Sequence, residues 1–227
     1  MNNDNNAVYL APTYFLDFSS PIVEEFAEKT CKSTDNPTER AIRLYYAVRD
    51  EIRYNPYDLS PSRETFTASS VLEKGSGYCV AKAIVLAALG RQQGIPSRLG
   101  FADVRNHLST SRLREVMNSD IFYYHGYTEF ILGGQWVKAT PAFNLSLCQR
   151  FKVKPLEFDG IHDSIFHECN QEDQKHMEYL HDHGNFTDLP FEEIFAAYRH
   201  HYPAMFEKLN STKSVGDFHK EAERQTA

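Results

Sequence analysis

The sequence lacks the features that would direct it to a membrane or to nucleic acid. No segment approaches the roughly 18 consecutive apolar residues of a bilayer span, and residues 1–6 have neither the basic flank nor the apolar core of a signal peptide. Asp and Glu (31) outnumber Lys and Arg (24), and no basic cluster forms a stripe that could follow phosphates. We therefore expect a cytoplasmic protein that binds neither membranes nor nucleic acid.

Cysteine is scarce as well. The four cysteines are widely spread and include no C-x-x-C pair, which excludes a small disulfide-stapled scaffold and predicts reduced thiols. Repeats and low-complexity linkers are also missing. With 227 residues, of which 41% are hydrophobic, the chain can bury a sizeable core, and we expect one domain over residues 1–227.

The first third of the sequence carries helix signals. Pro21 follows Ser20 at the first position of one expected helix, and Asn36 with Pro37 starts a second one. A third helix is predicted from Cys79, because the preceding glycines break the chain and the next residues are rich in Ala, Leu and Ile. Gly94 is its natural stop.

After Gly94 the pattern changes to strands. Residues 97–104, 122–132 and 135–140 read as strands, and Gly133-Gly134 joins the last two as a hairpin turn. We expect a short helix after Asn144, a strand over 156–166, and helices over 171–182 and 190–200. Helices followed by antiparallel strands predict an α+β protein.

Cys79 is the first candidate for chemistry. A thiol in the first turn of a helix lies near orphan N–H groups and partial positive charge, which favour the nucleophilic thiolate. Such a thiol would be the most readily alkylated cysteine of the chain. A cysteine on an apolar helix is, however, more often a small buried hydrophobe.

His125 is the second candidate. It lies on an alternating strand on which His125, Tyr127 and Glu129 share one face. A rigidly held imidazole there could take the thiol proton and later return it to a leaving amine. A structural histidine is the ordinary alternative.

Four segments in a fixed order favour a catalytic role over a structural one for Cys79 and His125. They are Gly77-Tyr78-Cys79, Gly94-Ile95-Pro96-Ser97-Arg98, His125-Gly126-Tyr127-Thr128-Glu129 and Trp136-Val137-Lys138-Ala139-Thr140-Pro141. In this order they resemble the transglutaminase-like superfamily of papain-type cysteine enzymes. The resemblance covers about residues 36–144. It implies a papain-like core in which the nucleophile helix packs on an antiparallel sheet, with a helical C-terminal extension over 145–227 that packs back on the core.

The resemblance also implies a third catalytic residue that this chain lacks. The superfamily has an aspartate two residues before the Thr-Pro pair, where it orients the histidine. That position holds Lys138, whose ammonium accepts no hydrogen bond. Asn144 could replace the aspartate with its amide oxygen, or Asp159 or Asp163 could approach from the later strand. We rank Asn144 first and leave the alternatives open.

The expected activity is cysteine-dependent acyl transfer at the carboxamide of a peptide or protein. Cys79 would form a thioester and His125 would act as acid and base, with Gly77 and the Tyr78 N–H beside the reacting carbonyl. We favour hydrolysis over transfer to an amine, since no segment resembles an acidic calcium loop. The alternative of another class is an inactive binding module, which Lys138 favours. No cofactor is implied, and the oligomeric state is open.

A histidine-rich segment near the C-terminus raises the question of a metal. Zinc binds histidine and cysteine, but the spacing of these residues fits no common zinc pattern. We therefore predict a solvated, histidine-rich surface and no metal site. The residues are His162, His167, Cys169, His176, His181 and His183.

Overall fold

The first two long helices begin where the sequence predicts. The computed structural model describes residues 3–107, 109–165, 177–209 and 217–225. Helix α1 (Pro21–Cys31) has Pro21 in its first turn, and α2 (Pro37–Glu51) is capped by Asn36. The Asn36 side chain accepts hydrogen bonds from the N–H groups of the first turn of α2, which satisfies donors that a helix start leaves without partners.

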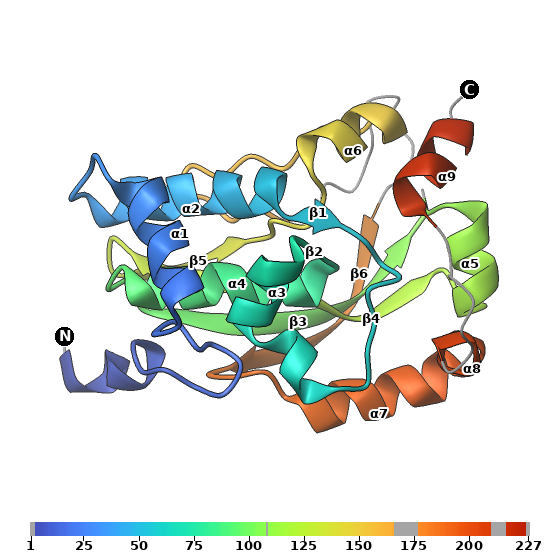
Figure 1. The fold of residues 1–227 in the computed structure, drawn as a ribbon, viewed down its shortest axis with the longest axis horizontal. Coiled ribbons are helices and arrows are strands. Elements are labelled where there is room, and N and C mark those ends of the chain that lie inside the picture. The colour runs from blue at the N-terminus through green and yellow to red at the C-terminus, as the bar shows by residue number, and fades with distance from the viewer. Residues whose placement is uncertain (1–2, 108, 166–176, 210–216, 226–227) are drawn as a thin grey trace.

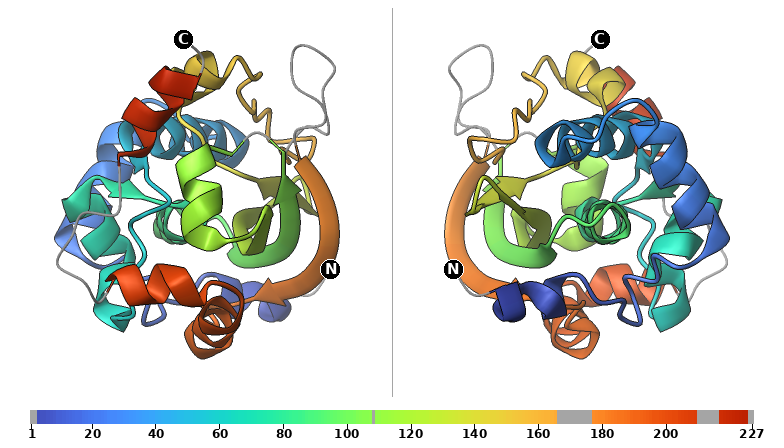
Figure 2. Two further views of the ribbon diagram at one scale, coloured as in Figure 1. Left: turned by 90° about the vertical axis from the view of Figure 1, so that its right-hand side faces the viewer. Right: turned by 90° about the vertical axis from the view of Figure 1, so that its left-hand side faces the viewer.

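Helix α4 (Cys79–Gln92) is the centre of the molecule. Every residue from Cys79 to Arg91 is buried, as expected for a helix that is covered on all sides. Helices α1, α2 and α3 (Ala68–Lys74) lie against one side of it, and the sheet curves round the other side (Figures 1 and 2). Gly94 has a φ of 71°, so it ends the helix in the left-handed conformation that glycine adopts readily.

The main sheet has four strands in the order β5-β4-β3-β6, and each strand is antiparallel to its neighbours. The strands are β3 (Ser97–Asn106), β4 (Ile121–Leu132), β5 (Gln135–Ala139) and β6 (Met177–Phe186). Gly133 and Gly134 both have positive φ in the β4–β5 turn, as a two-residue hairpin requires. The predicted α+β class, with the helix of Cys79 packed on an antiparallel sheet, is confirmed.

Shorter elements connect and cover this core. The C-terminal segments return to it, since β6 pairs with β3 and α7 contacts β4. The remaining elements are η1 (Asn3–Tyr9), β1 (Arg53–Tyr54), η2 (Arg63–Phe66), β2 (Ser76–Gly77), α5 (Ser111–Met117), α6 (Leu145–Phe151), α7 (Phe191–His201), α8 (Pro203–Leu209) and α9 (Phe218–Gln225).

Two predictions for the later part of the chain were wrong. Residues 156–165 form no regular strand and have only an isolated bridge between Ser164 and Ala139. Of the helix predicted over 171–182, residues 177–182 belong to strand β6 instead, while Phe166 and residues 171–176 lie outside the described residues. Strand β6 is at the sheet edge, and most of its residues are exposed. It therefore lacks the apolar alternation by which a half-buried strand is recognised.

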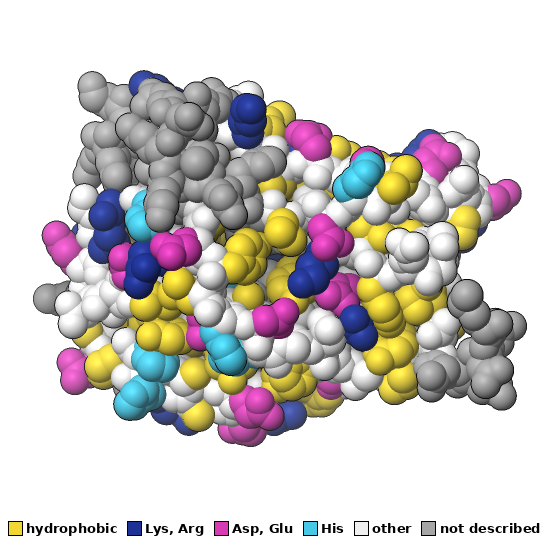
Figure 3. All heavy atoms as spheres, turned by 180° about the vertical axis from the view of Figure 1, so that it is seen from behind, with side chains coloured by type: hydrophobic (Ala, Val, Ile, Leu, Met, Phe, Trp, Pro, Cys, Tyr) yellow, Lys and Arg dark blue, Asp and Glu magenta, His cyan; other side chains and the backbone are white. Residues whose placement is uncertain are grey.

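The outer face of the sheet carries side chains of several chemical kinds. From behind, hydrophobic side chains lie among charged and histidine side chains instead of forming one continuous patch (Figure 3). None of the helices in the described part of the chain combines the length and apolar character needed to cross a bilayer.

Candidate active site

Cys79 is the first residue of α4, and Tyr78 is the N-cap. The Cys79 side chain is buried, with an exposed fraction of 5%. The backbone N–H groups of Gly126, Val80 and Cys79 itself approach the sulfur and lower its pKa, but burial outweighs them and raises the pKa of the thiol to about 11. The sequence predicted a thiolate from the helix start alone. The structure instead holds a neutral thiol, because desolvation opposes the charged form.

Strand β4 brings the backbone beside His125 to this thiol. Gly126, the residue after His125, directs its N–H at the Cys79 sulfur. A side chain at Gly126 would not fit, since its Cβ would lie 2.9 Å from the Cα of Val80 on α4. The predicted proximity of the two segments is thus a consequence of direct backbone packing between α4 and β4.

One face of β4 lies against α4. Thr128 donates its hydroxyl to the Ala83 carbonyl of α4, so this face of β4 covers the helix. Strand β5 ends at Ala139, which pairs with Thr128, and Gly126 lies two residues before Thr128 on β4.

His125 is buried to the same degree, with an exposed fraction of 3%. Burial lowers the pKa of its imidazole to about 3, and a hydrogen bond with its own backbone works in the opposite direction. At neutral pH the pair therefore consists of a neutral thiol and a neutral imidazole. A neutral imidazole is the form that can accept a proton from the thiol.

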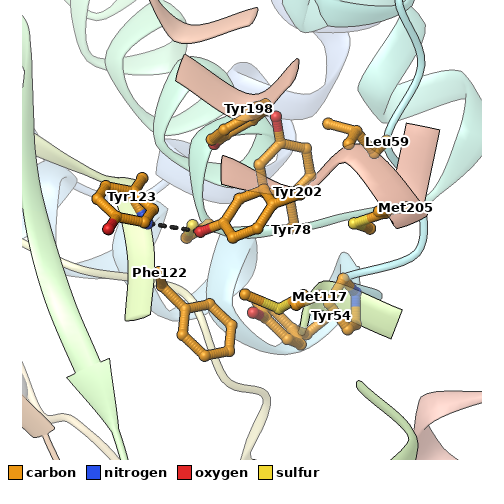
Figure 4. A pocket seen from close by; sticks show the side chains of 11 residues that line it. Tyr54, Leu59, Tyr78, Met117, Phe122, Tyr123, Tyr198, Tyr202 and Met205 are labelled. Atoms are coloured by element: carbon orange, nitrogen blue, oxygen red, sulfur yellow. Dashed lines mark hydrogen bonds between the residues drawn. The ribbon is translucent and has the colours of Figure 1, made fainter. Parts of the chain in front are cut away.

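A narrow pocket opens onto Cys79, and aromatic and thioether side chains form most of its wall (Figure 4). Tyr202 spans it by accepting the N–H of Tyr123 at 2.7 Å and donating to the Ile121 carbonyl at 2.8 Å. The Tyr78 hydroxyl is buried in the wall, where the Tyr198 hydroxyl approaches it as a donor. The lining residues are Tyr54, Pro56, Leu59, Tyr78, Cys79, Met117, Phe122, Tyr123, Tyr198, Tyr202 and Met205.

The sequence did not identify most of this pocket. Tyr198 and Tyr202 come from the C-terminal helices, and burial raises the pKa of both phenols. Their spacing of four residues places them on one face of a helical segment, but nothing in the sequence indicates that this face covers Cys79. Contacts between segments so far apart in the chain are set by tertiary packing.

The thiol, the histidine strand and the fold agree with one known family. Residues 24–141 match the transglutaminase-like superfamily, and this range contains both Cys79 and His125. The chain belongs to this superfamily. No curated protein matches the sequence.

Among solved structures, two bacterial proteins are similar to this transglutaminase-like chain. A candidate cysteine protease from Cytophaga hutchinsonii is 14% identical with a TM-score of 0.49, over 82% of this chain and 55% of that protein. A candidate protease from Parabacteroides distasonis is 16% identical with a TM-score of 0.40, over 62% of this chain and 27% of that protein. The chain thus spans about half or less of each of them.

Asn144, ranked first as the orienter of His125, has other contacts in this superfamily member. Its amide oxygen accepts the Tyr54 N–H at 2.6 Å, and its nitrogen donates to the carbonyls of Arg49 and Ile52, the latter at 2.8 Å. The ammonium of the buried Lys82 donates to the same two carbonyls. Asn144 therefore fastens the C-terminal end of α2, where carbonyl groups lack helical partners.

Replacing Asn144 by alanine tests which role dominates. We expect Asn144→Ala to lower the free energy of unfolding by about 1 to 3 kcal/mol, because the buried Tyr54 N–H loses its acceptor. Urea unfolding measures this effect. A residue that orients His125 would instead lower the turnover rate by about 10² to 10⁴ in the folded protein. A large rate loss without a loss of stability would contradict the fastening role.

The other two candidates and Lys138 also have contacts of their own. Asp163 accepts the backbone N–H of Lys138 at 2.9 Å, while the Lys138 ammonium lies 4.9 Å from the centre of the Tyr127 ring on the outer sheet face. Asp159 accepts the N–H groups of Ile161 and His162 and pairs with the His162 ring at 2.7 Å, which lowers the pKa of its carboxyl group. These contacts support none of them as the orienter.

Gly77 and Tyr78 line two different hollows. Tyr78 lines the aromatic pocket, whereas Gly77 lines a second hollow with a more polar wall that includes Asp58, Glu64 and Lys74. Leu59 borders both hollows.

The histidine-rich segment forms no metal centre in the part that can be described. Within the described residues, no group of three or more His, Cys, Asp or Glu side chains is arranged to hold a metal ion. His162 pairs with Asp159, and His183 pairs with Asp103 at 2.7 Å. His167, Cys169 and His176 lie outside the described residues.

Proposed function

We propose that this protein catalyses cysteine-dependent acyl transfer at the carboxamide of a peptide or protein, with water as the acceptor. The observation that carries the proposal is the placement of Cys79 at the start of α4, where three backbone N–H groups approach its sulfur and one of them belongs to the residue after His125. A cysteine that was only a core residue would not need this constellation.

The chemistry follows from the resting charges. His125 accepts the thiol proton as the Cys79 sulfur attacks the carbonyl carbon, and then gives it to the nitrogen of the departing amine. Water then attacks the thioester carbonyl as His125 takes one of its protons. The C–S bond breaks, His125 returns that proton to the Cys79 sulfur, and the water oxygen leaves in the carboxylic acid product. Backbone N–H groups at the start of α4 are the donors available to the developing oxyanion.

The apolar pocket supports a preference for apolar acyl groups. Its wall contains tyrosines, methionines and Leu59 but no charged side chain. We propose that an apolar side chain of the peptide occupies it. The Tyr78 hydroxyl, which Tyr198 approaches as a donor, keeps its own proton for a polar atom of the substrate.

One observation favours the alternative of an inactive binding module. Burial makes both the Cys79 thiol and the His125 imidazole harder to ionise, because it raises the pKa of the thiol and lowers the pKa of the imidazole. Lys138 at the position of the superfamily's aspartate favours the same alternative. In this alternative the pocket binds a peptide without cleaving it.

Product analysis separates these functions. We expect a peptide anilide with an apolar acyl residue to yield the carboxylic acid as its main product when the full chain is incubated without added amine. Addition of a primary amine such as glycinamide tests the acceptor, and mass spectrometry counts acid against amide. Predominance of the amide at millimolar amine would make the protein a transglutaminase. Binding of the peptide without formation of either product would favour the alternative of an inactive binding module.

A further inference from the structure

A bulge in strand β4 directly precedes His125. Ala102 of β3 pairs with His125 and Val104 pairs with Phe122, so Asp103 alone faces the two residues Tyr123 and Tyr124. An extra residue of this kind bends the strand and re-aims the side chains that follow it. The direction in which His125 leaves β4 is therefore set at this bulge.

A second irregularity lies on the other side of Asp103. In the pairing of β3 with β6, Phe101 faces Gly184 and Ala102 faces Asp182, which leaves His183 as the additional residue on β6. A further shift follows between Asp103 and Val104, where Leu180 is the additional residue. Asp103 thus lies among irregularities on both neighbouring strands.

The Asp103 carboxylate is bonded to both bulges. The same oxygen, Oδ1, accepts the Tyr124 N–H at 3.0 Å and contacts Nε2 of His183 at 2.7 Å. The rings of Tyr124 and His183 stack with their centroids 3.8 Å apart. Asp103 is itself buried, with an exposed fraction of 9%, so water competes little for these contacts.

The backbone of Tyr124 needs such support. Its φ is 52°, a left-handed conformation that a bulky residue adopts only when its surroundings impose it. Glycine is the residue that adopts such a φ at least cost. In this conformation the Tyr124 N–H is not used in the hydrogen-bond ladder between β3 and β4. The Asp103 carboxylate accepts it instead.

His125 is thus held by bonds to the backbone on both sides of it. The Tyr123 N–H is accepted by Tyr202, the Tyr124 N–H by Asp103, and the Gly126 N–H approaches the Cys79 sulfur. Partners from three parts of the chain therefore hold the backbone of residues 123–126, which carries the imidazole. They are Tyr202 before α8, Asp103 on β3 and Cys79 on α4.

We propose that Asp103 is a positioning residue for His125, which it aims by holding the left-handed bulge at Tyr124 together with His183. It acts on the backbone that carries His125, through the Tyr124 N–H. The kinetic consequence rests on the proposed function of His125, whereas the structural consequence does not.

The structural consequence is measured on the full chain labelled with ¹³C in its histidine rings. The His125→Gln variant assigns the His125 ring signal. We expect Asp103→Ala to shift or split this signal, and Asp103→Asn to leave it near its wild-type position, because the amide oxygen still accepts the Tyr124 N–H. Asp120→Ala, which removes an exposed carboxylate of the same hairpin, is the matched control and leaves the signal unchanged.

Kinetics on the same variants gives the second readout. Asp103→Ala lowers kcat about 10- to 100-fold with little change in KM, the size of effect expected from a catalytic group displaced by about 1 Å. Adding Tyr124→Gly to Asp103→Ala restores most of kcat, since glycine adopts a left-handed φ without strain. Adding Tyr124→Ala instead does not restore it.

The outcomes are distinguishable. A folded Asp103→Ala protein with an unmoved His125 signal and unchanged kcat overturns the proposal. Where Asp103→Ala does not fold, His183→Ala removes one anchor of the carboxylate and must move the same signal, and an unmoved signal there also overturns it. Full activity of His125→Gln would instead refute the proposed function and leave the ring-signal test of Asp103 standing.

Discussion

Replacing Cys79 by alanine lowers the rate of carboxamide cleavage by about 10⁴ to 10⁶, the range observed when the nucleophile of a catalytic unit is removed. The reason is that no other described thiol can substitute for it. Cys31 and Cys148 are buried elsewhere in the fold, and burial raises the pKa of both thiols. The measurement is the initial rate of release of the anilide from an apolar peptide substrate.

The matched control is Cys31→Ala, which removes a buried thiol at the end of α1. Its rate is expected to stay within about threefold of wild type, because truncating a thiol that packs as a small hydrophobe affects stability more than chemistry. Equal rates in Cys79→Ala and wild type would show that the cleavage does not pass through this thiol.

Lowering the pH from 7 to 4 reduces the free energy of unfolding by about 3 kcal/mol through His125 alone. Burial holds the pKa of its imidazole at about 3 in the folded protein, against about 6.5 in an unfolded chain. Between these values the unfolded state binds one more proton than the folded state. Stability is therefore complete above pH 6.5 and is lost as the pH falls toward 3.

Other groups also titrate in this range, so the comparison needs a variant. Urea unfolding of wild type and His125→Gln at pH 7 and pH 4 isolates the contribution, and the pH-dependent loss is expected to be smaller in the variant. His162→Gln is the control, since that imidazole is exposed and its pKa is raised by Asp159. The same loss in wild type and His125→Gln would mean that the imidazole is solvated.

Local signals in the sequence were sufficient for the core of the fold. Pro21, Asn36 and Gly94 mark helix ends by conformational preferences that depend on few neighbours. The hairpin at Gly133-Gly134 follows from the same kind of rule. The helix of Cys79 and the strand of His125 were found because their motifs occur in order, and their packing against each other is confirmed by the contact of Gly126 with Val80.

The charge state of the site could not be predicted from these motifs. A helix start favours thiolate, but the outcome depends on how much solvent reaches the sulfur, and that is decided by residues far along the chain. Tyr202 is fixed to β4 by two backbone hydrogen bonds, and Tyr198 packs 5.6 Å from it, ring centre to ring centre. The role of Asp103 was hidden for a similar reason, because a bulge exists only in the register of two strands.

The aromatic wall limits access to the buried pair. Cys79 and His125 are both almost fully covered, so the lining side chains restrict the approach of a carbonyl group to the sulfur. Tyr202 and Met205 line the pocket from the C-terminal segment. Entry of an apolar group would replace their contacts with similar ones.

The most direct test of the account is to trap the acyl-enzyme. An activated ester of an apolar acyl group is mixed with the full-length protein, quenched in acid within seconds and examined by mass spectrometry after digestion. The account predicts one acyl group, carried as a thioester by the peptide that contains Cys79, absent from Cys79→Ala and long-lived in His125→Gln. An acyl group on another residue, or none on Cys79 while the substrate is consumed, would contradict the assignment of Cys79 as the nucleophile.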